Sequence, residues 1–231
     1  MNHDLAANDF GFSHFLSQTD TVGKIVLALL LLLSVASWYF IITKGIANLG
    51  ARKRADAFLK QFWQAGSLQE MRTALDASGN DNAFAGLAQQ ALMVNDGHQS
   101  GAEKLLAAGG MSEYLTRVLR NGIDQESTQV ESGLTVLASA GSAAPFIGLF
   151  GTVWGIYNAL VQIGMSGQGT LDKVAGPVGE ALIMTAVGLA VAIPAVLAYN
   201  SFTRRNRLWL AQLDNFAHDL YVLVTVGDKK A

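Results

Sequence analysis

Residues 132–171 read SGLTVLASAGSAAPFIGLFGTVWGIYNALVQIGMSGQGTL, 40 consecutive positions without an aspartate, glutamate, lysine or arginine. Two further uncharged stretches occur in the chain, 19 residues at 25–43 and 23 residues at 181–203. A bilayer core about 30 Å thick needs about 20 apolar residues in a helix that rises 1.5 Å per residue. The three stretches therefore predict three transmembrane helices.

The composition agrees with a membrane protein and excludes an ordinary soluble domain. Charged residues make up 15% of the 231 residues, against about 25% in soluble domains. The formal net charge of -2 excludes a generally basic nucleic-acid binder. The absence of cysteine excludes disulfides, thiolate metal sites and a thiol nucleophile.

The first stretch is predicted to be a retained anchor and not a secretion signal. The segment before it is acidic, with Asp4, Asp9 and Asp20 against a single Lys24. The apolar run 25–42 is also longer than the 7–15 residues or so of a signal sequence.

Basic residues predict the orientation. Those that follow the first and third stretches are Lys44, Arg52, Lys53, Arg54, Arg204, Arg205 and Arg207. The loop between the second and third stretches carries only Lys173. By the positive-inside rule the N-terminus lies outside and the C-terminus in the cytoplasm.

We therefore expect an all-α integral membrane protein with two long helices that extend into the cytoplasm, plus small cytoplasmic helices. The expected segments are an outer N-terminal segment 1–23, span 24–43, a cytoplasmic helical domain 44–131, span 132–163, an outer turn 164–172, span 173–203 and a cytoplasmic C-terminal helix 204–231.

Apolar residues at helical spacing predict the cytoplasmic helices. One amphipathic helix is expected around 55–63 and a shorter one around 84–92. Ser112 is predicted to be the N-cap of one unbroken helix that continues to about residue 163. A second long helix is expected from about 172 to 227, antiparallel to the first and joined to it by a glycine-rich turn.

The second span has a face of small residues, which predicts close helix packing in lipid. Its members are Gly141, Ala144, Gly148, Gly151, Thr152, Gly155 and Ala159. The pattern leaves open whether the partner helix belongs to the same chain. Spans two and three contain, inside them or at their edges, all three prolines of the chain, Pro145, Pro177 and Pro194. Each proline leaves one backbone carbonyl group without its helical hydrogen bond. The prolines therefore indicate either simple helix curvature or a carbonyl group that protein or water hydrogen-bonds instead.

Glu180 is the most informative single residue. It lies about eight residues into the third span and is followed by 23 uncharged positions. An ionised carboxylate at such a depth costs at least about 2.5 kcal/mol, so a proton-carrying carboxyl is expected. The alternative is a protonated glutamate that makes one structural hydrogen bond.

Two threonines are expected near this carboxyl. Counted from the outer turn, Glu180 lies about 12 Å deep, and Thr152 and Thr185 both lie about 20 Å deep. Two hydroxyls from different helices would thus meet below the carboxyl, where the three groups could pass a proton or coordinate a small cation. Taken singly, either threonine could instead bond back to its own helix.

The motifs of spans two and three resemble those of a known family. GLFGTVWGI at 148–156, GEAL at 179–182 and AIPA at 192–195, with Tyr199 and Asn200 after them, resemble the MotA/TolQ/ExbB proton-channel family, most of all its ExbB/TolQ branch. The resemblance is specific across about 135–205. One departure is AGPVG at 175–179, where many members have APGIA, so that the proline is shifted by one position.

The resemblance implies a proton-driven motor subunit of the Gram-negative inner membrane. It implies a pentamer around the helices of an ExbD-type partner that carries a transmembrane aspartate, with work passed to TonB. Glu180 takes the place of the family's essential glutamate, and Thr152 and Thr185 take the places of its pore threonines.

The segment ADAF at 55–58 with Phe62 and Trp63 resembles TolQ-type members. Residues 162–171 and the tail with FAHDL at 216–220 resemble ExbB-type members, and the ExbB type is favoured.

The sequence is compared with two other classes of protein besides a proton-driven motor, an enzyme and a passive scaffold. An enzyme is disfavoured because His3, His14, His98 and His218 are scattered and no HExxH, GxSxG or Walker A motif occurs. No cofactor or metal is therefore expected. A passive oligomeric scaffold would use the same small-residue faces but would tolerate Glu180→Gln.

Overall fold

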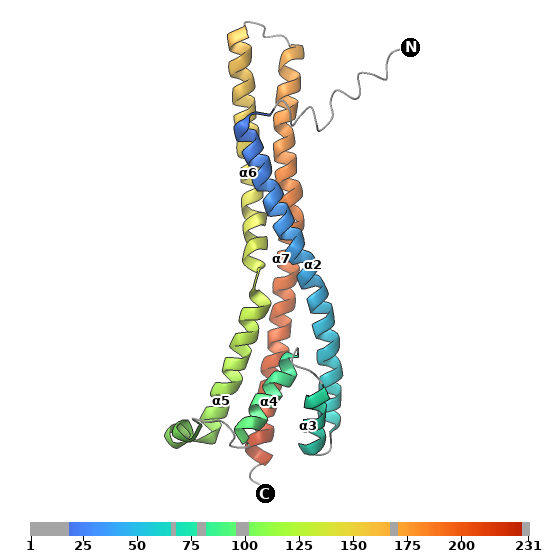
Figure 1. The fold of residues 1–231 in the computed structure, drawn as a ribbon, viewed down its shortest axis with the longest axis vertical. Helices are drawn as coiled ribbons and strands as arrows, with labels where there is room; N and C mark the ends of the chain where they lie inside the picture. Colours follow the sequence, from blue (N-terminus) through green and yellow to red (C-terminus); the bar gives the residue numbers. More distant parts are fainter. Residues whose placement is uncertain (1–18, 66–67, 78–81, 96–101, 167–170, 228–231) are drawn as a thin grey trace, which may run out of the picture. The chain divides into compact units, whose positions relative to one another are not determined.

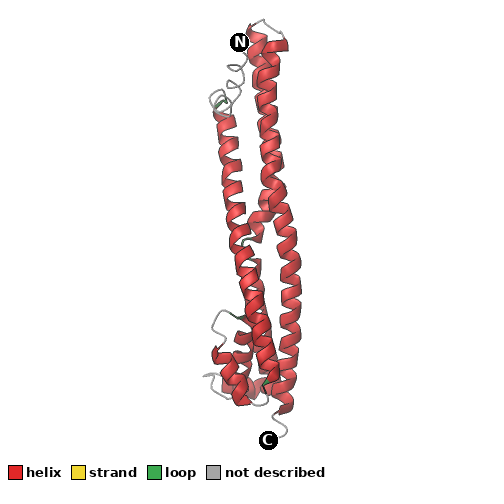
Figure 2. Cartoon of the chain, turned by 90° about the vertical axis from the view of Figure 1, so that its right-hand side faces the viewer, coloured by secondary structure: helices red, strands yellow, loops and turns green. Residues whose placement is uncertain are grey.

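The structure, a computed structural model, describes residues 19–65, 68–77, 82–95, 102–166 and 171–227. These ranges form six helices and contain no strand (Figures 1 and 2). The helices are α2 (Thr21–Gln64), α3 (Leu68–Ala77), α4 (Ala83–Asn95), α5 (Ala102–Glu131), α6 (Leu134–Ser166) and α7 (Leu171–Gly227). Three helical segments are long and apolar enough to cross a bilayer. The prediction of an all-α membrane protein with three spans is confirmed.

The chain divides into two compact units. The first, here called the membrane unit, comprises residues 1–42 and 133–200; the second unit comprises 43–132 and 201–231. In the described residues the membrane unit contains the start of α2, all of α6 and the first part of α7. It therefore holds all three uncharged stretches apart from a few terminal residues.

The membrane unit has a small core and a large apolar surface. Leu30, Ala144 and Met184 are buried where α2, α6 and α7 meet. Leu32 and Phe146, in contrast, are 66% and 72% exposed. A surface of this kind is stable when lipid or other apolar helices surround it, as membrane spans require.

The backbones of α6 and α7 touch at two glycines. A Cβ atom on Gly148 would lie 2.6 Å from the Met184 carbonyl oxygen and 3.1 Å from the Gly188 Cα. A Cβ atom on Gly188 would lie 2.6 Å from the Ala144 carbonyl oxygen. A partner of the small-residue face is thus α7 of the same chain, which answers the question that the sequence left open.

The second unit has an aromatic core. The Phe216 ring centroid lies 5.3 Å from that of Phe62 and 5.4 Å from that of Phe84, with the ring planes strongly inclined. Phe58 joins the same group, and all four rings are buried. The amphipathic helices expected around 55–63 and 84–92 are confirmed, as parts of α2 and α4. Helix α3 was not predicted.

The prediction of one unbroken helix over 112–163 is wrong. Helix α5 ends at Glu131, and α6 begins at Leu134 after a two-residue turn. Gly133 in this turn has a φ of +74°, a left-handed conformation that favours glycine. A Cβ atom there would also meet the Phe40 ring at 2.3 Å.

Side chains from distant parts of the second unit make this interruption possible. A broken helix leaves carbonyl groups without their usual amide partners. The Val130 carbonyl oxygen accepts hydrogen bonds from Lys44 Nζ at 2.9 Å and from Asn206 Nδ2 at 2.7 Å. Two donors thus compensate for the lost helical bonds.

The start of the long helix also differs from the prediction. Helix α5 begins at Ala102 and is kinked at Gly110, whose φ of 79° and ψ of 168° are not helical. Ser112 lies within the helix after this kink, and its hydroxyl contacts the Tyr221 hydroxyl. Glycine at the kink, and not a serine N-cap, therefore defines where the straight part of α5 begins.

Helices α6 and α7 are longer than expected at the turn that joins them. Helix α6 continues to Ser166 and α7 begins at Leu171, so both helices extend into the predicted turn 164–172. Residues 167–170, and residues 1–18 of the N-terminal segment, lie outside the described residues. The predicted C-terminal helix is the last part of α7, which runs to Gly227.

Candidate functional site

Two threonine hydroxyls meet between α6 and α7. Thr152 Oγ1 lies 2.6 Å from Thr185 Oγ1, 2.9 Å from the Ala181 carbonyl oxygen and 3.1 Å from the Gly148 carbonyl oxygen. Thr152 is buried, with 6% of its surface exposed. The prediction that the two hydroxyls meet at one level is confirmed, and Thr152 also makes the bond to its own helix that was the alternative.

One arrangement of the hydrogens satisfies Thr152 fully. A hydroxyl has one hydrogen to donate and lone pairs with which to accept. When Thr152 donates to the Ala181 or Gly148 carbonyl oxygen, the hydrogen between the two hydroxyls must come from Thr185. Thr152 is then satisfied as both donor and acceptor, so the pair is a complete polar network inside an apolar helix pair.

The glycine contact positions this pair. Thr152 follows Gly148 by one helical turn, and Thr185 precedes Gly188 by three residues. Because neither glycine has a side chain, the two backbones approach closely enough for short threonine side chains to reach each other. The small-residue face therefore sets the geometry of the hydroxyl pair.

Glu180 lies on the same helix as Thr185, five residues before it and about 7.5 Å along the axis. It is partly buried and lines a pocket of about 120 Å³ in the membrane unit. The other polar groups of the pocket include Asn158 and Gln162 of α6, and Pro177 contributes to the wall one turn before Glu180. The pocket gives Glu180 a polar environment inside a largely apolar unit.

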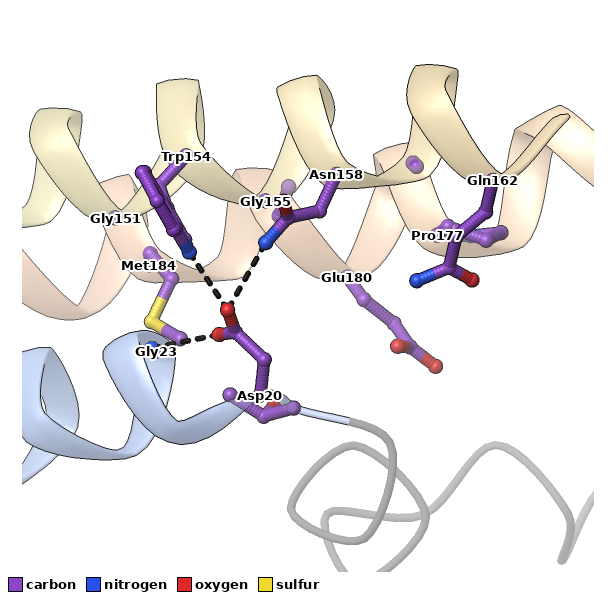
Figure 3. Close-up of a pocket in the computed structure, with 13 residues that line it drawn as sticks. Asp20, Gly23, Gly151, Trp154, Gly155, Asn158, Gln162, Pro177, Glu180 and Met184 are labelled. Atoms are coloured by element: carbon purple, nitrogen blue, oxygen red, sulfur yellow. Dashed lines mark hydrogen bonds between the residues drawn. The ribbon is translucent and has the colours of Figure 1, made fainter. Parts of the chain in front are cut away.

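Asp20, which directly precedes α2, lies in the same pocket. Its place in the sequence predicted only that it belongs to an acidic N-terminal segment. Asp20 Oδ1 accepts a hydrogen bond from the Gly23 backbone amide at 2.8 Å. Asp20 Oδ2 accepts from Trp154 Nε1 at 2.7 Å and from Asn158 Nδ2 at 2.9 Å. Figure 3 shows these three bonds converging on one carboxylate, with the Glu180 side chain directed elsewhere.

A signal for this cluster exists in the sequence. Asp20 directly precedes the first span, in the position of a helix N-cap. Trp154 and Asn158 are four residues apart on an apolar helix and therefore share one face. A capping acid before one span and a pair of polar donors on one face of another are the features that could have indicated the contact.

The six residues predicted for helix packing or pore lining all lie in the membrane unit. Gly141, Ala144, Gly148, Gly151 and Gly155 lie close to residues of other helices in the same chain, and Pro177 lines the pocket. Gly151 lies against two helices, because its added Cβ would meet Val26 of α2 at 2.9 Å and the Met184 side chain of α7 at 3.2 Å.

Fold and site together define a helical membrane protein with an ionisable group and a hydroxyl pair inside its apolar spans. Residues 84–215 match the model of the family described as the MotA/TolQ/ExbB proton channel family. The chain belongs to this family, as the motifs of spans two and three indicated.

Similar proteins cover nearly the whole chain. The biopolymer transport protein ExbB of Xanthomonas campestris pv. campestris is 40% identical over 240 residues, which cover 99% of this chain and 94% of the relative. The ExbB protein of Neisseria meningitidis serogroup A is 43% identical over 198 residues, with 85% and 89% covered. The Tol-Pal system protein TolQ of Pseudomonas aeruginosa is 34% identical over 213 residues, with 90% of each chain covered.

Proposed function

We propose that this chain is the ExbB-type subunit of a motor driven by the proton-motive force. With an ExbD-like partner it energises a TonB-like protein for nutrient import across the outer membrane. The observation that carries the proposal is the partly buried contact of 2.6 Å between Thr152 and Thr185, on the same helix pair as the carboxyl of Glu180. The membrane is the Gram-negative inner membrane, with the N-terminus in the periplasm and the C-terminus in the cytoplasm.

In the proposed pathway a proton enters from the periplasmic side and binds the Glu180 carboxylate. The neutral carboxylic acid then releases it past Thr152 and Thr185 towards the cytoplasm. Each charge that crosses the membrane gains about 2.3 kcal/mol per 100 mV of potential. The second acid of the relay is an aspartate on the single transmembrane helix of the partner.

The same proposal includes a homo-oligomer. Apolar side chains of α6 and α7 such as Phe146, Met165 and Leu197 are more than 60% exposed in one chain. Several copies would cover part of this surface and place spans two and three around a central lumen, with span one on the lipid side. The number of five copies rests on the family resemblance.

Proton flux tests the proposal. The chain and its ExbD-like partner are reconstituted together in liposomes that contain a pH-sensitive dye, and flux is measured after a potential is applied. Glu180→Gln should abolish the flux that depends on the partner, because the amide cannot release a proton. Glu113→Gln, at an exposed position of α5, is the matched control and should retain it. Undiminished flux in Glu180→Gln would remove Glu180 from the pathway, and absence of partner-dependent flux in the unmodified chain would support a passive scaffold instead.

Complementation separates the ExbB type from the TolQ type. The chain and its partner are expressed in one host that lacks ExbB and in another that lacks TolQ. We expect restored TonB-dependent uptake in the first host, because the ExbB relatives named above are 40% and 43% identical to this chain and the TolQ relative 34%. Rescue confined to the second host would assign the chain to the Tol-Pal system.

A further inference from the structure

The Asp20 carboxylate connects two helices at the outer end of the membrane unit. Its Oδ1 caps the first turn of α2 through the Gly23 amide, and its Oδ2 holds Trp154 and Asn158 of α6. Hydrogen bonds to an ionised acceptor are stronger than those between neutral groups. One side chain therefore fixes both the start of α2 and its attachment to α6.

We propose that Asp20 is a positioning residue for the Glu180 site: its carboxylate clamps α2 to Trp154 and Asn158 and so holds in place one wall of the pocket that contains Glu180. The proposal rests on the proposed proton pathway. It adds a residue that directly precedes the first span, so that the start of α2 also contributes to that pathway.

The packing next to the Asp20 carboxylate explains how the clamp affects the Glu180 pocket. A Cβ atom on Gly23 would lie 3.4 Å from Met184 Cε, so α2 lies against α7 at this level. Met184 is buried and directly precedes Thr185. The pocket that Asp20 lines next to α2 is also lined by Gly23, Met184 and Glu180 (Figure 3). A shift of the start of α2 would therefore move the wall beside Glu180 and the packing of Met184.

The hydrogen-bond pattern explains how Asp20 acts as a clamp. Both oxygens of Asp20 accept N–H bonds, one from the start of α2 and two from α6. Three of the roughly four lone-pair positions of the carboxylate are therefore used to hold the two helices together.

Asp20→Asn is the informative substitution because it keeps the shape of the side chain. An asparagine has one acceptor oxygen and one NH₂ group, so it cannot accept from Gly23 on one side and from Trp154 and Asn158 on the other. The double substitution Asp20→Asn/Asn158→Asp reverses the polarity of the bond between positions 20 and 158. The amide at position 20 can then donate to the carboxylate at position 158, and the net charge is unchanged.

The first measurement tests the clamp without any transport assay. The chain has four tryptophans, so a sample labelled with ¹⁵N in the indole groups gives four indole N–H resonances in an NMR spectrum. Trp154→Phe identifies the resonance of Trp154. We expect Asp20→Asn to shift this resonance alone, because a charged acceptor is removed from that indole. An unshifted Trp154 resonance would show that the clamp is absent and overturn the proposal.

The second measurement is partner-dependent proton flux in the liposome assay, with assembly checked by native mass spectrometry. We expect Asp20→Asn to assemble normally and to lose flux about tenfold, which corresponds to about 1.4 kcal/mol. The double substitution should recover part of this loss, because the bond between positions 20 and 158 is restored while Trp154 Nε1 faces an NH₂ group. Trp154→Phe, which removes one donor but keeps an aromatic ring, should assemble and show a smaller loss.

The outcomes separate this proposal from the proposed function. Wild-type flux in Asp20→Asn would overturn the positioning role. A double substitution with flux as low as that of Asp20→Asn would also overturn it, since the charge of Asp20 itself would then be required. Absence of partner-dependent flux in the unmodified chain would refute the proton pathway, and the NMR measurement would still decide whether the clamp exists.

Discussion

Gly148→Ala adds one methyl group at the closest approach of α6 and α7. The new Cβ atom would lie 2.6 Å from the Met184 carbonyl oxygen, where ordinary contacts begin at 3.4 Å. Both the oxygen and the Gly188 Cα at 3.1 Å belong to a helix backbone, so neither can rotate away. The helices themselves must separate.

The size of the effect follows from these distances. Relief of the overlap requires a displacement of about 0.8 Å, which would lengthen the contact between Thr152 and Thr185 beyond the usual range for O–H···O hydrogen bonds. An overpacked core costs about 1–3 kcal/mol. The intrinsic gain in helix propensity from glycine to alanine is at most about 1 kcal/mol and does not offset this cost.

Thermal stability in detergent, followed by circular dichroism, measures the effect. Gly164→Ala is the matched control, because Gly164 lies on the same helix and no atom lies within 4 Å of its added Cβ. We expect a lowered melting temperature for Gly148→Ala and an equal or raised one for Gly164→Ala. Equal melting temperatures for both variants would refute the argument that backbone contact at Gly148 holds the helix pair together.

Three further predictions concern the site and the helix interruption. Thr185→Val should leave assembly intact in native mass spectrometry but reduce proton flux, because it keeps the shape and removes the hydroxyl that faces Thr152; unchanged flux would remove the hydroxyl pair from the pathway. Glu180→Asp should assemble but lose most of its proton flux, because the carboxyl group is withdrawn by one methylene group. Full flux in this variant would show that the exact placement of the carboxyl group is not required. Gly133→Ala should lower the melting temperature by more than Gly164→Ala changes it, because the φ of +74° and the Phe40 ring at 2.3 Å both oppose a side chain; an unchanged value would contradict this.

Much of the membrane unit could be predicted from the sequence because its signals are local. An absence of charge over 19, 40 and 23 residues locates the spans. Glu180 is conspicuous because it is a charge inside such a stretch. The meeting of Thr152 and Thr185 followed from counting residues from the turn, which works because a helix rises by a constant 1.5 Å per residue.

The features that were missed depend on contacts between distant residues. The bond from Trp154 to Asp20 joins positions 134 residues apart, and its acid lies outside the apolar stretches. The interruption before Gly133 depends on Lys44 and Asn206, which reach the Val130 carbonyl from 86 and 76 residues away. Gly188 is one of 24 glycines, and its role depends on which face of α7 meets α6. Local patterns indicate which residues are available for these contacts but not which partners they take.

The single hydrogen on the Thr152 hydroxyl sets a rule for repeated use of the proposed proton pathway. When a proton passes along two hydroxyls, each hydroxyl gives up the hydrogen it held and keeps the one it receives, so both end with reversed orientations. The Ala181 and Gly148 carbonyl oxygens, at 2.9 Å and 3.1 Å, are the acceptors to which Thr152 must turn back. A second proton can follow only after this rotation. Both threonine hydroxyls would thus have to rotate back to their starting orientations after each proton, and this rotation would limit how quickly protons can follow one another.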